Sequence, residues 1–375
     1  MILPALKIGD LEVEKAIVQG GMGIGISLSG LAAAVANEGG IGVISSVGLG
    51  FLKGEHNKRN FNSNAVYLRD EIRKAKAIAT QGAIGVNIMV AITDFDEMVK
   101  ASIEEKADII FAGAGLPLKL PGLVKSIDPN TDTKLGVIVS SARAAELICR
   151  SWMKKYQVLP DIIVVEGPKA GGHLGFAHDH VENPDYALEN ILPPVVETMH
   201  KISYENNKSI PVIAGGGVYT GEDIFNIMNL GADGVQMGTR FVATEECDAD
   251  RAFKETFVRC KKKDITLIKS PVGLPGRVIT SEFIREVQNG VRKPFSCPWK
   301  CLKTCNFKEA PYCIADALIN AQQGEMSEGF AFAGSNAYKV DSIISVSELF
   351  ETLEKEFDRA VFQNFAERPL KVEVF

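Results

Sequence analysis

A histidine preceded by two glycines is the clearest candidate for acid–base chemistry in this sequence. The segment Glu166–Gly175 reads EGPKAGGHLG, and its imidazole is His173. Paired glycines let a backbone lie against a ligand, and an imidazole can carry a proton near neutral pH. We therefore predict that His173 is catalytic; a histidine that only pins the loop is the alternative. His178 and His180 follow closely, but without a nearby third ligand they do not indicate zinc.

Two glycine-rich turns in consecutive segments predict a phosphate-binding site. Gly215, Gly216 and Gly217 end one apolar run directly before Thr220 and Gly221, which begin a predicted helix. Gly238, Thr239 and Arg240 end the next run. Glycine lets backbone N–H groups approach an anion, and the start of a helix adds its positive end. One such run alone is more often a tight turn, but two in succession favour a phosphorylated ligand.

Two amide side chains are placed where a planar heterocycle could use them. Asn87 lies in GVNIM and Gln236 in GVQMG, both apolar runs in which a buried amide needs partners. Amides can both donate and accept hydrogen bonds. A ligand or a polar network within the protein could satisfy them.

Four of the seven cysteines are crowded into one short stretch. Cys297, Cys301, Cys305 and Cys313 have the spacing C-x3-C-x3-C-x7-C. Four thiolates in such a span could bind a [4Fe–4S] cluster or zinc, although the spacing matches no common motif. Buried or redox-active free thiols are the alternative.

The elements that must position these residues follow a strand–helix rhythm. Short β-branched runs alternate with amphipathic stretches, which is typical of parallel sheets. We expect eight strands, at Ala16–Gln19, Gly42–Ser45, Gly85–Met89, Asp108–Ala112, Gly136–Ser140, Asp161–Val165, Pro211–Ala214 and Gly234–Met237. We expect helices at, among others, Leu28–Asn37, Tyr67–Ala79, Ala142–Lys154 and Gly221–Leu230. Eight units favour a TIM-type (β/α)8 barrel of the α/β class over an open, doubly wound sheet, with the chemistry on the loops that follow the strands.

The chain is expected to divide into a barrel and additions to it. We predict the barrel at residues 1–243, a mostly helical, cysteine-rich segment packed on it at 244–345, and a C-terminal helix at 346–375. The segment Lys269–Arg277 contains prolines and glycines and could reach over the site as a lid.

Composition narrows the choice of partners and compartment. Hydrophobic residues make up 46% and charged residues 23%, and the net charge is -6 without long blocks of one sign. We therefore expect no nucleic-acid partner. The N-terminal residues resemble neither a secretory signal nor an anchor, and no apolar run is long enough to cross a bilayer. These features predict a cytoplasmic protein without a membrane partner, and they leave open whether it forms a homodimer.

Five motifs together resemble a known enzyme family. They are Gln19-Gly-Gly-Met22, GVN at Asn87, AGGH at His173, the glycines 215–217, and QMGTRF at Gln236–Phe241. The set is similar to the nitronate monooxygenases, formerly called 2-nitropropane dioxygenases, and to the flavin-dependent enoyl-acyl carrier protein reductases that share their fold. The resemblance covers roughly the first two thirds of the chain, so the four clustered cysteines lie outside it.

The resemblance implies FMN as cofactor and His173 as the catalytic histidine. With the phosphate turn and Glu166, the expected cofactor contacts are Gly21, Met22, Asn87, Glu166, Gly171, Gly215, Gly216, Gly217, Gln236, Met237, Gly238 and Thr239. The activity that the resemblance implies in first place is oxidation of alkyl nitronates with dioxygen. The alternative is NAD(P)H-dependent reduction of an enoyl thioester, with or without an iron–sulfur cluster. Two departures favour the reductase: Glu166 stands where nitronate enzymes usually have glutamine, and the Gln19–Met22 loop is closer to the reductase form.

Two further readings of the same residues stay open. The first is a flavin- or phosphate-binding barrel without catalysis, against which His173 argues. The second is a barrel enzyme that acts on a phosphorylated substrate without flavin, since such enzymes use the same phosphate loops.

Overall fold

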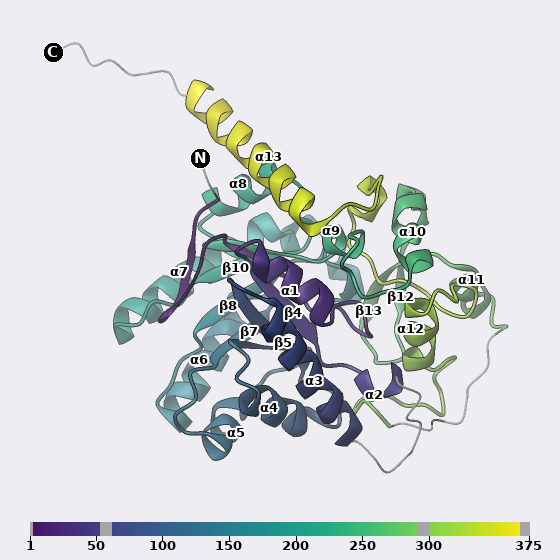
Figure 1. Ribbon diagram of the computed structural model, residues 1–375, viewed down its shortest axis with the longest axis horizontal. Coiled ribbons are helices and arrows are strands. Elements are labelled where there is room, and N and C mark those ends of the chain that lie inside the picture. Colours follow the sequence, from purple (N-terminus) through teal and green to yellow (C-terminus); the bar gives the residue numbers. More distant parts are fainter. Residues whose placement is uncertain (1–2, 53–61, 292–296, 298–299, 368–375) are drawn as a thin grey trace.

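The computed structural model describes residues 3–52, 62–291, 297 and 300–367, and its centre is a closed barrel of eight parallel strands (Figure 1). In order around the barrel these are β10 (Val212–Gly215), β11 (Gly234–Met237), β3 (Ile17–Gln19), β4 (Ile41–Ser45), β5 (Ala83–Met89), β6 (Ile109–Gly113), β7 (Lys134–Val139) and β8 (Ile162–Glu166). The predicted TIM-type barrel is confirmed, and each predicted strand is present with ends shifted by no more than two residues.

Side chains from the strands fill the barrel interior. Val18, Val43 and Val164 lie there with Phe111, which is 1% exposed. Gly85 and Gly136 stand on the strands either side of Phe111, and a Cβ at Gly136 would lie 2.8 Å from its ring. These two glycines therefore make room for the largest interior side chain.

Helices surround the barrel, as the alternation of strands and amphipathic stretches predicts. They are α1 (Ser29–Asn37), α2 (Leu49–Leu52), α3 (Asn62–Ile78), α4 (Phe95–Glu104), α5 (Leu120–Ile127), α6 (Ala142–Tyr156), α7 (Leu188–Asn206), α8 (Gly221–Asn229) and α9 (Thr239–Val242). Their apolar faces pack on the outside of the sheet in one large core with the outward-facing strand residues.

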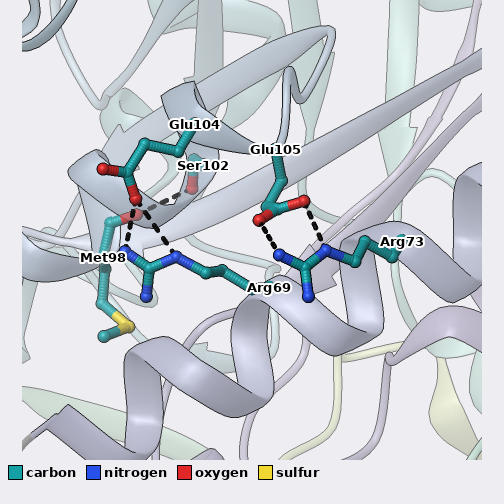
Figure 2. A network of polar contacts seen from close by, with 6 residues as sticks. All are labelled: Arg69, Arg73, Met98, Ser102, Glu104 and Glu105. Atoms are coloured by element: carbon teal, nitrogen blue, oxygen red, sulfur yellow. Dashed lines mark hydrogen bonds and ion pairs between the residues drawn. The ribbon is translucent and has the colours of Figure 1, made fainter.

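Two arginine–glutamate pairs connect α3 to the end of α4 at the surface. Figure 2 shows Arg69 reaching Glu104 and Arg73 reaching Glu105, each through two nitrogen atoms. Such exposed pairs contribute about 0.2–1 kcal/mol each. The buried apolar face between these helices therefore holds them more than the pairs do.

A short hairpin covers the barrel at the starts of its strands. It consists of β1 (Leu6–Ile8) and β2 (Leu11–Val13), which were not predicted. Leu6 and Ile8 pack with the interior residues, and Lys134 at the start of β7 pairs with Asp10 in the hairpin turn. This end is filled, so only the opposite end can open to a ligand.

The residues after the barrel form helices and, unexpectedly, two strands. The helices are α10 (Arg251–Arg259), α11 (Glu282–Gln288), α12 (Ile314–Gln322) and α13 (Val346–Glu367); residues 368–375 of the predicted last helix lie outside the described part. The strands β12 (Ile265–Lys269) and β13 (Pro275–Ile279) form a hairpin, and β13 also pairs with β9 (Gly172–His173). Apart from α13, these elements lie together on one side of the barrel (Figure 1).

The last helix ties the end of the chain to the barrel. In Figure 1 α13, in yellow, crosses α8, and its Leu349, Phe350 and Leu353 are fully buried. Glu356 also accepts a hydrogen bond from the backbone N–H of Gly221 at the start of α8. Within the described residues, no helix combines the length and apolarity needed to cross a membrane.

Candidate active site

A cavity of about 310 Å³ opens at the carboxyl ends of the barrel strands. Eleven of the twelve predicted cofactor residues line it together with His173; Gly215, at the end of β10, does not. This is the end at which barrel enzymes carry their sites. The structure thus brings the predicted residues together, while their individual roles stay a prediction.

His173 is held in place by an element that the sequence did not predict. It lies in β9, opposite Gly276 of β13, and its Nε2 is 2.7 Å from the hydroxyl oxygen of Ser270. Its ring meets the edge of Phe332 at a centroid distance of 4.9 Å. Burial lowers the pKa of His173 to about 4, so the imidazole is neutral at physiological pH.

Glu166 ends β8 and lines the same cavity. Among the described residues its carboxylate has no hydrogen-bond or ion-pair partner. Burial therefore raises the pKa of Glu166 from its ordinary value of 4.5 to about 7. The loop between β8 and β9 thus begins with a carboxyl group that titrates near neutrality and ends with an imidazole that does not.

Two amides in the cavity retain unused hydrogen-bonding capacity. Gln236 has no partner within the described chain, and Asn87 makes only a long bond of 3.5 Å to the carbonyl of Phe111. The amide of Gln19, in contrast, is fully buried and bonded to the backbone at Val43 and Gly20. Asn87 and Gln236 are therefore the amides available to the ring or ribityl chain of a flavin.

The two glycine-rich turns form a cradle with free backbone donors. Gly216 and Gly217 have φ angles of +99° and +97°, which favour glycine. The N–H groups of Gly217, Val218 and Gly238 line the cavity region without an acceptor in the described residues. Three orphaned donors around one space fit a phosphate.

The start of α8 was expected to add its positive end to the phosphate site, but it does not line the cavity. Carboxylates already accept from three N–H groups at this end of the helix: Asp223 accepts from Tyr219 and Thr220, just before α8, and Glu356 accepts from Gly221, its first residue. Neither Thr220 nor Gly221 lines the cavity. Carboxylates of the protein itself occupy this helix end, so the phosphate cradle consists of the turns alone.

A segment that no sequence motif indicates covers the cradle. Gly334 donates its N–H to the hydroxyl of Thr239 at 3.1 Å, and the Asn336 amide donates to the carbonyl of Gly217 at 2.7 Å. A Cβ at Gly171 would lie 2.7 Å from the backbone at Gly334, so this close approach requires glycine there. The sequence AGSN indicates a turn at residues 333–336, but no local pattern indicates what that turn contacts.

The cavity wall away from the glycines is apolar. Phe51 from α2 and Ile314 and Leu318 from α12 contribute to it, with Ile24 and Val47 from loops after barrel strands. None of these residues was predicted to belong to the site. An apolar wall beside a polar cradle is the usual arrangement in a site for an organic ligand.

The cysteine-rich segment reaches the cavity through one of its members. Cys301 lines it, and Leu302 forms a β-bridge with Ile92 after β5. Burial raises the pKa of both Cys301 and Cys313 to about 12, which keeps these thiols protonated.

The predicted metal site at Cys297, Cys301, Cys305 and Cys313 is not confirmed. All four are free cysteines, and the described residues contain no group of three His, Cys, Asp or Glu side chains that could hold a metal ion.

The barrel, the phosphate cradle and a neutral histidine in the same cavity define a flavin-dependent oxidoreductase of the (β/α)8 type. A family model described as nitronate monooxygenase matches residues 5–356. The chain therefore belongs to the nitronate monooxygenase family and is an FMN-dependent oxidoreductase. The match includes the cysteine-rich segment, so the expectation that the resemblance ends after two thirds of the chain is wrong.

Individual relatives agree with this assignment. A probable nitronate monooxygenase of Staphylococcus aureus (strain Newman) is 27% identical over 303 residues, which cover 74% of this chain and 78% of that protein. The structure of FabK from Thermotoga maritima has 28% identity and a TM-score of 0.72, covering 94% of this chain and 96% of that one. Nitroalkane oxidase of Streptomyces ansochromogenes shares the fold, with 20% identity, a TM-score of 0.69 and coverage of 94% and 98%.

Proposed function

We propose that this protein reduces the carbon–carbon double bond of an apolar enoyl thioester, with FMN as its resident cofactor and NAD(P)H as electron donor. The apolar wall of Phe51, Ile314 and Leu318 carries the proposal, because an acyl chain can bury against it. From the sequence alone nitronate oxidation comes first, and this wall is the reason to reverse the order. The likeness to FabK, whose family includes enoyl reductases, is consistent with it.

The residues of the cavity fit FMN. The free N–H groups of Gly217, Val218 and Gly238 would hold the phosphate, and the amides of Asn87 and Gln236 would hold the polar edge of the flavin. When bound, FMN supplies the hydride chemistry that the side chains lack.

The chain's own residues position the substrate and exclude water. The apolar wall removes water from the acyl chain, and Glu166 offers a carboxyl group that is half protonated near pH 7. His173 is neutral and hydrogen-bonded to Ser270, so it can hold a substrate oxygen without adding a charge.

Oxidation of an alkyl nitronate with dioxygen is the second candidate. The family model and the curated relatives favour it through their names. The ionised form of Glu166, which has no cationic partner among the described residues, would repel a nitronate anion. This repulsion is the specific reason to place nitronates second.

A variant of the apolar wall separates the two candidates. Leu318→Asp should raise KM for long-chain enoyl thioesters by about tenfold or more, since a buried CH₂ group contributes about 0.8 kcal/mol. Nitronate turnover, if present, should change little. The exposed Leu147→Asp on α6 is the control. Steady-state NAD(P)H oxidation measures enoyl thioester reduction, and oxygen consumption measures nitronate turnover. An unchanged KM across chain lengths would remove the acyl-chain site.

An iron–sulfur cluster is not part of this proposal. Iron and sulfide analysis of protein purified without oxygen decides the question independently. Stoichiometric iron that is lost in Cys301→Ser would restore the cluster as the electron entry point.

A further inference from the structure

The partner of His173 restricts what its imidazole can do. Ser270 lies in the turn between β12 and β13, is only 3% exposed, and places its hydroxyl oxygen 2.7 Å from His173 Nε2. The backbone N–H of Val272 points at the same oxygen, at 3.4 Å. The hydroxyl therefore accepts from Val272 and still has its own proton to donate.

That proton identifies the tautomer of the imidazole. Within the described chain the only acceptor in reach of the Ser270 hydroxyl is Nε2 of His173. A buried donor without an acceptor costs about 1–3 kcal/mol. The bond is satisfied when Nε2 is unprotonated, which places the ring proton on Nδ1. Tautomers are assigned from such hydrogen-bond networks.

Nδ1 then remains as an unused donor at the cavity. It has no partner in the described residues, and His173 lines the cavity wall. A bound ligand is thus the partner left for the Nδ1–H group.

We propose that Ser270 is a positioning residue that holds His173 as the neutral Nδ1–H tautomer, so that the imidazole donates a hydrogen bond to the substrate's carbonyl oxygen and does not act as a base. The identity of this oxygen as that of a thioester rests on the proposed function. Hydride transfer to the β-carbon, from FMN that NAD(P)H has reduced, would move the π electron pair of the double bond toward the thioester oxygen. The Nδ1–H group stabilises that charge, and the α-carbon then takes its proton from solvent water.

The surroundings of His173 are consistent with a neutral donor. Burial is what lowers its pKa, to about 4. Lys169 of the same loop is directed to Glu189, and Arg277 of β13 is bonded to the carbonyls of Pro168 and Ala170. Neither cation is bonded to the imidazole, so burial and Ser270 determine its state.

The tautomer can be measured without any substrate. Nitrogen NMR spectra of the FMN-loaded protein with labelled histidine distinguish a protonated ring nitrogen from an unprotonated one, and His173→Gln identifies the signals. Near neutral pH we expect a protonated Nδ1 and an unprotonated Nε2. An Nε2–H tautomer or an imidazolium would overturn the proposal.

Three variants test the role of the hydroxyl. Ser270→Ala should give a mixture of tautomers and lower kcat by about tenfold or more, with a smaller change in KM. Ser270→Thr keeps the hydroxyl, so it should retain the Nδ1–H tautomer and the kcat of the wild type. Ser281→Ala, which removes a hydroxyl at the start of α11, is the control. An unchanged tautomer in Ser270→Ala would contradict the assignment. The expected tautomer without enoyl thioester reduction would refute only the proposed function.

Discussion

Two titratable groups at the ends of one loop are shifted in opposite directions by the same cause. Burial disfavours charge, so it raises the pKa of Glu166 to about 7 and lowers the pKa of His173 to about 4. Two groups whose pKa values are shifted apart in this way mark the acid–base roles of a site. At neutral pH the imidazole is neutral and the carboxyl group is the one that titrates.

Glu166→Gln should remove a pH dependence of stability. In flavin-free protein the carboxyl group titrates near 7 when folded and near 4.5 when unfolded, so the folded state binds more protons between these values. The stability that Glu166 contributes is fully present below about pH 4.5 and is lost as the pH rises through about 7. The free energy of unfolding should fall by about 3 kcal/mol over this range. Urea unfolding from about pH 4 to about pH 8 measures this.

The exposed Glu189→Gln serves as the control for that series. It should leave the decline in stability unchanged, while Glu166→Gln flattens it. Equal slopes in the wild type and in Glu166→Gln would show that folding does not raise the pKa of Glu166.

Gly238→Ala should weaken FMN binding without destabilising the protein. A Cβ there would meet only the side chain of Met22, whose sulfur would be 3.4 Å away, and the φ angle of -116° suits alanine. The methyl group would instead take space from the phosphate, so we expect Kd for FMN to rise by about tenfold, the equivalent of one lost hydrogen bond. Fluorescence titration gives Kd and thermal melting gives stability. A normal Kd would place the phosphate elsewhere.

At the scale of elements, one buried arginine supports the loop between β8 and β9. Arg277 of β13 is 7% exposed and donates to the carbonyls of Pro168 and Ala170. The loop that carries Gly171 and His173 thus depends on a strand far away in the sequence.

Arg277→Met should therefore destabilise the protein and loosen the cofactor. Two buried carbonyls would lose their donor, which costs about 2–4 kcal/mol. Arg277→Lys should recover part of this, because lysine keeps the charge but not the planar fork. Arg251→Met, at the surface, should stay within about 0.5 kcal/mol. Urea unfolding compares the variants. An Arg277→Met variant as stable as the wild type would mean that the loop keeps its conformation without this arginine.

The elements that the sequence predicts differ from those that it does not in how they are stabilised. The barrel strands are apolar runs followed by glycine or polar turns, so composition indicates them. β9 has two residues and β13 begins with Pro275 and Gly276, which resemble a loop. These strands exist because Gly172 pairs with Arg277 across a long stretch of chain, and no local pattern records such pairing.

At the scale of the whole molecule, α13 holds the end of the chain against the barrel. Its Leu353 is fully buried where α13 crosses α8. Leu353→Ala should cost about 2–5 kcal/mol, whereas Phe362→Ala on the same helix should be nearly neutral because Phe362 is 64% exposed. Thermal melting of both variants checks this, and equal effects would contradict the docking of α13.

The candidate site is predictable only where it belongs to the barrel. Asn87, Glu166 and Gln236 lie at or near the carboxyl ends of their strands, so the rule that barrels bind ligands there predicts them. Leu318 and Gly334 reach the cavity, and Ser270 reaches His173, from later segments. Their positions depend on how those segments pack over the barrel, and that packing is a property of the whole fold.

An absorbance spectrum recorded without oxygen tests the central claim most directly. The purified protein should show flavin bands that NADH or NADPH bleaches and that a crotonyl thioester restores. Bands that ignore both nucleotides, are bleached by an alkyl nitronate and recover only when air is admitted would contradict enoyl reduction and establish the oxygen-dependent reaction instead.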